Sequence, residues 1–76
     1  MDVKQKVGNR IRELRNQKEL SQEALAHEAG LDRTYINSIE NGRRNVSISN
    51  IERIAKALGM TLQEFFSTDL FGNEHG

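Results

Sequence analysis

The 76-residue sequence predicts an all-α fold, a compact bundle of five short helices. Three observations indicate this fold class. The chain has no proline, its apolar residues recur every three or four positions, and no strand-like alternation of apolar and polar residues runs beyond a few positions. The length suits one small domain, which we place at residues 1–70, followed by a flexible tail at residues 71–76.

The first two helices follow from apolar spacing and from residues that begin or end a helix. A stripe of apolar residues spaced three or four apart predicts a first helix over Lys4–Lys18, and it consists of Val3, Val7, Ile11 and Leu14. Ser21 is placed to cap a second, short helix by accepting a hydrogen bond from a free backbone N–H, and Gly30 ends it. The inner side of this helix consists of Leu25, Ala26 and Ala29.

The remaining three helices carry similar signals. Asp32 is placed to cap a third helix, which Asn41 and Gly42 stop. Ser47 caps a fourth helix that Gly59 closes, with the most apolar stripe of the chain, which consists of Ile48, Ile51, Ile54, Ala55 and Leu58. A capping box made by Thr61 and Glu64 begins a fifth helix, whose apolar residues are Leu62, Phe65 and Phe66.

Composition excludes several kinds of site. There is no cysteine, and the two histidines, His27 and His75, lie far apart, so we expect no disulfide, no metal site and no cofactor. No apolar run approaches the ~20 residues of a membrane helix, and we expect a cytoplasmic protein. The zero net charge hides an asymmetry, because residues 1–44 hold nine basic and seven acidic side chains, whereas residues 45–76 hold two and four.

The segment from Gln22 to Asn41 carries the functional signal, because two helices joined by a short turn with a glycine can cross steeply, so that one protrudes. Ala26 lies where the two helices would press together, and Gly30 sits where the turn needs a positive φ. The third helix then turns outward a polar face made of Arg33, Thr34, Tyr35, Asn37 and Ser38. Because such side chains match the donors and acceptors of base edges, we expect them to read bases in the major groove of double-stranded DNA.

A second group of residues suits the DNA backbone. Arg43 and Arg44 follow the third helix and extend its polar surface, where ion contacts with phosphates give affinity without sequence preference. Gln22, at the start of the second helix, has a side-chain amide and a free backbone N–H that suit a phosphate.

The sequence resembles the helix-turn-helix of the lambda-repressor-like (Cro/C1, XRE) DNA-binding family, and the likeness spans roughly residues 7–66. The residues that carry it are Ser21-Gln22-Glu23-Ala24-Leu25-Ala26, Ala29-Gly30-Leu31, Tyr35-Ile36 and Ile39-Glu40-Asn41-Gly42. Within that family, residues 32–36 and 40–47 look most like the controller proteins of restriction-modification systems, small dimeric regulators that bind palindromic operators. Prophage repressors and antitoxins share much of the pattern and remain alternatives.

The resemblance also assigns roles to residues. It implies that Gln22 contacts phosphate, that the polar face of the third helix enters the major groove, and that Arg43, Arg44 and Asn45 lie near the DNA backbone. It further implies that Arg15 pairs with Glu40, which would tie the first helix to the end of the third.

The end of the chain holds more large apolar side chains than one face of a two-turn helix can bury. We therefore expect a homodimer interface formed by Met60, Leu62, Phe65 and Phe66, with Val46 and Ile48 as possible additions.

Two other classes of function compete with a DNA-binding regulator. One is an antitoxin-like module whose helices bind a partner protein. The other is an enzyme, which we do not expect, because the sequence lacks a phosphate loop, a Gly-x-Ser-x-Gly elbow and a His-Glu-x-x-His pair. A regulator that activates transcription would also need a surface for RNA polymerase, and the acidic candidates are Glu19, Glu23 and Glu28.

Overall fold

The computed structural model describes residues 1–72 and consists of five α-helices and one 3-10 turn. The helices are α1 (Val3–Gln17), α2 (Gln22–Ala29), α3 (Arg33–Glu40), α4 (Ile48–Ala57) and α5 (Leu62–Phe66), and the turn is η1 (Asp69–Phe71). The predicted fold class is confirmed for the described residues, and each helix begins or ends within one or two residues of its predicted limits. No helix among residues 1–72 is long and apolar enough to span a membrane.

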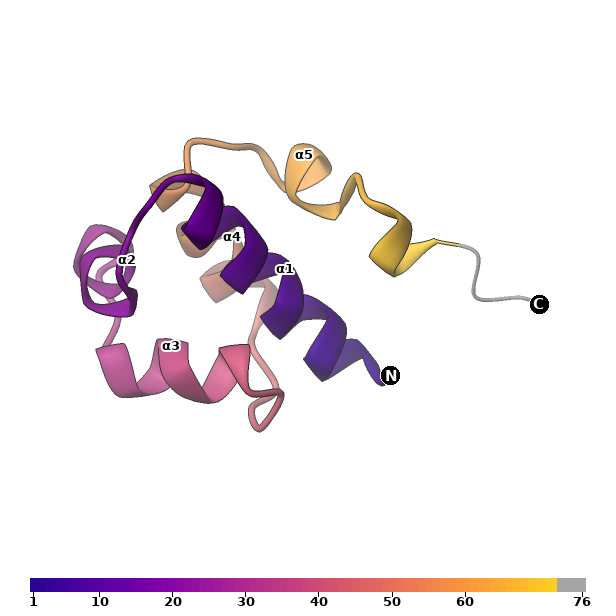
Figure 1. Ribbon diagram of the computed structural model, residues 1–76, viewed down its shortest axis with the longest axis horizontal. Coiled ribbons are helices and arrows are strands. Elements are labelled where there is room, and N and C mark those ends of the chain that lie inside the picture. The colour runs from indigo at the N-terminus through magenta and orange to yellow at the C-terminus, as the bar shows by residue number, and fades with distance from the viewer. Residues whose placement is uncertain (73–76) are drawn as a thin grey trace.

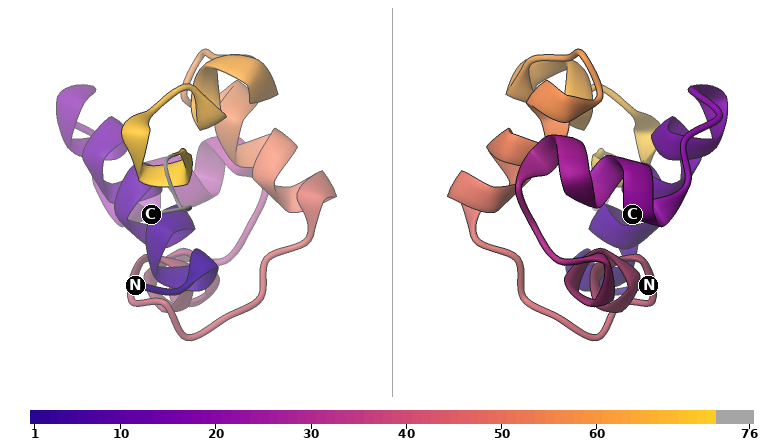
Figure 2. Two further views of the ribbon diagram at one scale, coloured as in Figure 1. Left: turned by 90° about the vertical axis from the view of Figure 1, so that its right-hand side faces the viewer. Right: turned by 90° about the vertical axis from the view of Figure 1, so that its left-hand side faces the viewer.

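The arrangement leaves α3 at one edge of the molecule. Helix α1 runs diagonally across the middle, α3 lies at the edge opposite α5, and α2 lies beside α3 (Figure 1). The turned views in Figure 2 again place α3 and α5 at opposite ends, with the loop between α3 and α4 on the same side as α3. Helix α3 therefore packs on α1 and α2 with one side only.

Capping side chains fix where most of the helices begin. The hydroxyl oxygens of Ser21, Ser47 and Thr61 each accept a hydrogen bond from the backbone N–H three residues later, at 3.0–3.1 Å. Thr61 and Glu64 form the predicted capping box. Asp32 differs from the prediction, because it occupies the capping position of α3 with extended backbone but its carboxylate makes no capping hydrogen bond.

One core holds all the helices together. Its largest completely buried side chains come from every helix and are Phe65, Ile11, Leu25, Ile36, Ile39, Ile54 and Leu58. The guanidinium of Arg10 adds a polar clamp, donating to the carbonyl oxygens of Phe65 at 2.7 Å and Glu64 at 2.9 Å. This contact holds the end of α5 against α1, so α5 is fixed by both packing and hydrogen bonds.

The last described residues lie where the domain and the tail were predicted to meet. Phe71 was expected in a flexible tail, but it ends η1, and its ring lies edge-on to Phe66 with centroids 4.9 Å apart. The backbone N–H of Leu70 donates to the Thr68 hydroxyl at 3.5 Å, a local contact within the same turn. Of the predicted tail, residues 71 and 72 are described, and residues 73–76 lie outside the described residues, so the limit between domain and tail stays a prediction.

Candidate nucleic-acid interface

The turn between α2 and α3 is built as the sequence predicts. Gly30 has φ +71°, in the left-handed region that favours glycine. Leu31 then donates its backbone N–H to the carbonyl of Ala26 at 2.9 Å, which closes the end of α2. Ala26 is 2% exposed, so a larger side chain there would push neighbouring helices apart. These three residues set the angle at which α3 leaves α2.

Helix α3 keeps a polar outer surface at its first turn. Arg33 and Thr34 are exposed, whereas Tyr35, Asn37 and Ser38 are half-buried. The apolar residues of the helix, Ile36 and Ile39, are completely buried on the opposite side. Arg33 and Thr34 are therefore accessible to a ligand, whereas the side chains of Tyr35, Asn37 and Ser38 are partly covered by the rest of the chain.

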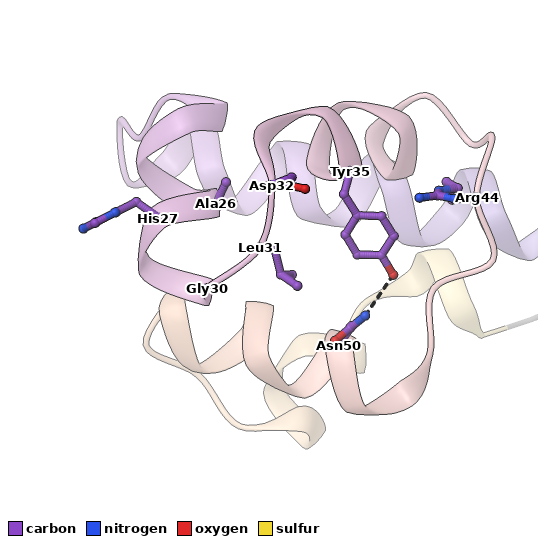
Figure 3. A pocket seen from close by; sticks show the side chains of 8 residues that line it. All are labelled: Ala26, His27, Gly30, Leu31, Asp32, Tyr35, Arg44 and Asn50. Carbon is purple, nitrogen blue, oxygen red and sulfur yellow. Dashed lines mark hydrogen bonds between the residues drawn. The ribbon is translucent and has the colours of Figure 1, made fainter.

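Tyr35 reaches across to α4. Its hydroxyl oxygen accepts a hydrogen bond from Nδ2 of Asn50 at 3.0 Å, and the guanidinium carbon of Arg44 lies 5.0 Å from the centroid of its ring. Figure 3 shows the ring between these two residues, at an open hollow of about 600 Å³ that α2, α3 and α4 border. Tyr35 therefore joins α3 to α4 through Asn50 and to the loop after α3 through Arg44.

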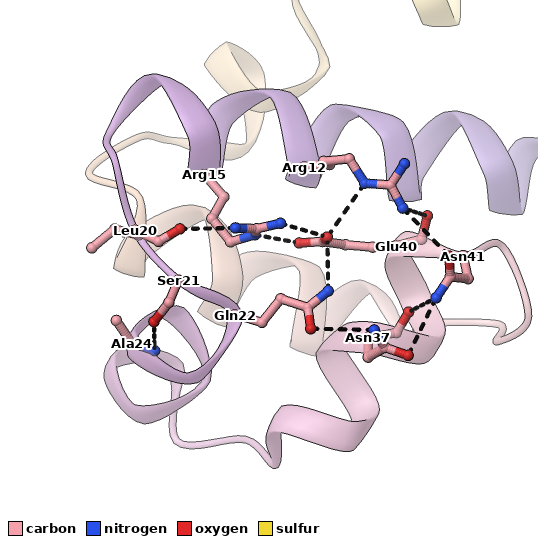
Figure 4. A network of polar contacts seen from close by, with 9 residues as sticks. All are labelled: Arg12, Arg15, Leu20, Ser21, Gln22, Ala24, Asn37, Glu40 and Asn41. Carbon is pink, nitrogen blue, oxygen red and sulfur yellow. Dashed lines mark hydrogen bonds and ion pairs between the residues drawn. The ribbon is translucent and has the colours of Figure 1, made fainter.

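Glu40 is the buried ion of this region. Its carboxylate is completely buried and accepts two hydrogen bonds from the guanidinium of Arg15, from Nε at 2.7 Å and from Nη2 at 3.0 Å. Arg15 also donates to the carbonyl of Leu20, at 2.9 Å. The expected pairing of Arg15 with Glu40 is confirmed, and it links α1, the loop before α2, and α3 (Figure 4).

A chain of side-chain amides continues from Glu40, and sequence reasoning did not find it. Gln22 donates to Glu40 at 3.1 Å, Asn37 donates to Gln22 at 3.2 Å, and Asn41 donates to Asn37 at 3.2 Å. Arg12 completes the group, because its Nη2 donates to Oδ1 of Asn41 at 3.4 Å. The sequence gives no signal for these contacts, because they join three helices and depend on how those helices cross.

The buried position of Glu40 and its charged and hydrogen-bonding partners shift the pKa of its carboxyl group. Burial raises the pKa of the carboxyl, but the hydrogen bonds from Arg15 and Gln22 and the positive charges of Arg15 and Arg12 lower it by more, so the pKa lies below its ordinary value. Glu40 is therefore a buried carboxylate at neutral pH.

This shift predicts a loss of stability in acid. Because the pKa of Glu40 is lower in the folded chain than in the unfolded chain, the unfolded chain binds the proton first as the pH falls. The stabilisation from the ionised carboxylate is complete above the ordinary pKa of glutamate, about 4.3, and is lost progressively as the pH falls from there through the lower pKa of the folded chain. We expect the free energy of unfolding to fall as the pH drops below about 4.3, with a smaller fall in Glu40→Gln. Urea denaturation of both proteins at several pH values measures this, and equal pH dependence in the two would contradict it.

The residues expected near the DNA backbone are placed as follows. Arg43, Arg44 and Asn45 are exposed in the loop between α3 and α4. Gln22 is half-buried at the first position of α2, where helix geometry leaves backbone N–H groups without an intrahelical acceptor. All four therefore lie at the start of α2 or in the loop that follows α3.

The four residues expected at a dimer interface differ in exposure. Phe65 is completely buried, so it is a core residue and has no exposed area for a second chain. Met60, Leu62 and Phe66 are half-buried. The exposed large apolar side chains among the described residues are Met1, Val3 and Ile48, at 70%, 63% and 60%. Val3 also lines a second hollow, of about 160 Å³, whose other lining residues are Val7, Val46, Ile51 and Phe66 together with Lys4, Arg44 and Asn45.

Comparison with known proteins places the chain in a family. Residues 11–65 match the family model described as Helix-turn-helix. The chain is 54% identical over 67 residues to the control protein C.MunI of Mycoplasma sp, and the match covers 87% of this chain and 90% of that protein.

Two solved structures agree with this result. The restriction-modification controller protein C.AhdI from Aeromonas hydrophila has a TM-score of 0.80 at 51% identity, covering 83% of this chain and 96% of that chain. The controller protein C.Esp1396I, solved as a tetramer in complex with its natural 35-base-pair operator, has a TM-score of 0.82 at 39% identity, covering 87% of each chain. The chain therefore belongs to the helix-turn-helix family and is similar to its restriction-modification controller proteins.

Proposed function

We propose that this chain is a transcription regulator of a restriction-modification system, which binds a palindromic operator as a homodimer. One observation carries the proposal: Arg33 and Thr34 are exposed on α3, which the α2–α3 turn holds at the edge of the molecule. A regulator of this kind inserts such a helix in the major groove. The match to a control protein over 90% of that protein's length supports the specific role, because the two chains correspond almost from end to end.

The base contacts fall to the polar face of α3. The guanidinium of Arg33 can donate two hydrogen bonds to O6 and N7 of guanine, and the hydroxyls of Thr34 and Ser38 can bond to base edges. Tyr35 joins them only if its ring leaves Asn50, because its hydroxyl is bonded there. Arg43, Arg44, Asn45 and the start of α2 at Gln22 hold the phosphates on either side of that helix.

The proposed dimer interface is centred on exposed Ile48 and the hollow beside Phe66 and Val46. These residues are apolar, and a two-fold axis through such a patch matches it to itself in the partner. Ile48 begins α4 directly after the loop that lies on the same side of the molecule as α3 (Figure 2), which supports an interface that keeps both copies of α3 near one face of the assembly. Met60 and Leu62 contribute only the parts of their side chains that remain exposed.

The acidic residues proposed for RNA polymerase are also accessible. Glu19, Glu23 and Glu28 are all exposed, and two of them lie on α2. Their contact with polymerase remains a prediction. The proposed activity of the chain is binding, with no chemical reaction.

The base-reading role of Arg33 is tested with its alanine variant. We expect Arg33→Ala to weaken binding to an operator selected from a random duplex library by about 1–3 kcal/mol, roughly 5- to 150-fold in Kd, and to relax preference at one base position. The reason is loss of a paired donor contact to a base edge. Fluorescence anisotropy with operator and scrambled duplexes measures both effects.

Lys56→Ala is the matched control, because Lys56 is an exposed cation on α4 and its loss removes the same charge outside the proposed surface. Unchanged preference in Arg33→Ala would contradict the assignment. Failure of the wild-type chain to select any sequence, with affinity for DNA that hardly changes with salt, would favour the partner-protein module over the regulator.

A further inference from the structure

The amide chain at the start of α2 runs between two groups of opposite charge. Glu40 lies at one end and Arg12 at the other, and three neutral amides lie between them in the order Gln22, Asn37 and Asn41. Nε of Arg12 also lies 3.5 Å from Oε1 of Glu40, so the five side chains form a closed ring (Figure 4).

The two charged groups fix the direction of every hydrogen bond in this ring. The Glu40 carboxylate can only accept, so Gln22 must turn its NH₂ group toward it and its Oε1 toward Asn37. Asn37 must then donate to Gln22 and turn its Oδ1 toward Asn41. Asn41 in turn presents its Oδ1 to Arg12, which can only donate. No amide in the ring can be reversed without setting two donors or two acceptors face to face.

This direction decides what Gln22 offers outward. Nε2 of Gln22 donates one N–H to Glu40, and Oε1 accepts a hydrogen bond from Asn37. The second N–H of Nε2 is therefore the donor that the amide can offer to a ligand. The backbone N–H of the same residue belongs to the first turn of α2 and has no intrahelical acceptor. Residue 22 therefore offers donors, which match the oxygens of a phosphate.

The same contacts limit what Asn37 can do. Reading adenine takes one N–H and the oxygen of an asparagine amide together. In the structure the Oδ1 of Asn37 accepts from Asn41, and its Nδ2 donates to Gln22. The backbone carbonyl of Asn37 also accepts from Nδ2 of Asn41, at 2.9 Å, which holds the two asparagines together. Each half of the Asn37 amide thus already has a partner inside the chain, so a paired contact with adenine would have to share or replace these hydrogen bonds.

We propose that Asn37 is a positioning residue, which contributes to DNA affinity by fixing the Gln22 amide as a phosphate donor and does not read a base. The inference rests on the proposed DNA-binding function. It changes the role expected for Asn37 from the sequence, where its place on the outer side of α3 pointed to a base contact. It also makes residue 37 a source of affinity that is the same for every DNA sequence.

A double-mutant cycle tests this role. The proteins are the wild type, Gln22→Ala, Asn37→Ala and the double variant, each titrated into fluorescent operator and scrambled duplexes. We expect Asn37→Ala to weaken binding to both duplexes by the same factor, about 5-fold, since one hydrogen bond is lost. In the Gln22→Ala background the same change should cost less than about 2-fold, because the residue it positions is absent. The dependence of Kd on salt should stay unchanged, because no charge is removed.

Ser38→Ala is the matched control, because Ser38 is a half-buried neighbour on α3 with a proposed base contact, and its loss should lower affinity for the operator only. Thermal unfolding of every variant checks the fold, and Asn37→Ser replaces Asn37→Ala in the cycle if the alanine variant unfolds.

Each outcome bears on one claim. An Asn37→Ala effect confined to the operator, or one that persists in full without Gln22, would overturn the positioning role while leaving the DNA-binding function intact. No effect on either duplex would overturn it as well. Failure of the wild type to bind any duplex would overturn the proposed function, and this inference with it.

Discussion

Replacing Arg15 with alanine is expected to lower the free energy of unfolding by about 3–5 kcal/mol, because the change leaves the buried carboxylate of Glu40 without its principal partner. The Leu20 carbonyl loses its donor as well. A domain of this length has a total stability of about 4–11 kcal/mol, so the expected loss is a large fraction of the total. Chemical denaturation followed by circular dichroism measures the change.

Arg12→Ala provides the control for this prediction. Arg12 also faces Glu40, but its side chain is 45% exposed and its Nε lies 3.5 Å from the carboxylate, so its loss should cost about 1 kcal/mol or less. Equal losses in the two variants would show that burial does not set the strength of these pairs, and would contradict our description of Glu40.

Gly8→Ala is the second substitution with a large expected effect. Replacing a glycine by alanine in an exposed part of a helix normally raises the free energy of unfolding by up to about 1 kcal/mol. Here Gly8 is buried where α1 meets the end of α3, and a Cβ atom would lie 2.2 Å from the backbone oxygen of Ile39 and 2.9 Å from that of Glu40. Backbone atoms cannot rotate away, so the helices must separate. We expect a loss of about 3 kcal/mol or more.

Gly72→Ala is the matched control, because a Cβ there would meet no atom within 4 Å and its φ of −106° suits any residue. Denaturation curves of the two variants should therefore differ clearly. A Gly8→Ala protein as stable as the wild type would show that α1 and α3 are not in the close contact described.

Much of the fold follows from local signals in the sequence. Ser21, Ser47 and Thr61 begin helices where predicted, since capping depends on residues three apart. The left-handed Gly30 follows for the same reason, because a helix end and a turn are local features. The pairing of Arg15 with Glu40, 25 residues apart, came only from the family resemblance, because no local rule joins them.

The features that the sequence missed depend on the crossing of helices. Gly8 looks like an ordinary helical glycine until α3 is packed against it. Phe65 and Phe66 are adjacent and equally apolar, and only the position of α5 decides that the first is buried and the second partly exposed. Asn37 lies among outward-facing residues in the sequence, yet the ring with Gln22 and Asn41 engages its amide.

Glu40 contributes both to the stability of the fold and to the proposed DNA-binding surface. The carboxylate holds α1 to α3 through Arg15, and it also holds the amide of Gln22 at the start of α2. The α2–α3 pair is thus fixed to the rest of the domain by the same buried charge that orients its proposed phosphate donor. Acid or loss of Arg15 should therefore affect the DNA-binding surface together with the fold.

The central claim is that the exposed end of α3, with Arg33 and Thr34, enters the major groove. Dimethyl sulfate footprinting on a duplex selected by the wild-type protein tests it most directly, because this reagent methylates guanine N7 in the major groove and adenine N3 in the minor groove. We expect protection of guanine N7 in two half-sites about one helical turn, ~34 Å, apart, as two copies of one helix require. Protection of adenine N3 alone, or no protection of guanine N7 on a bound duplex, would contradict the claim.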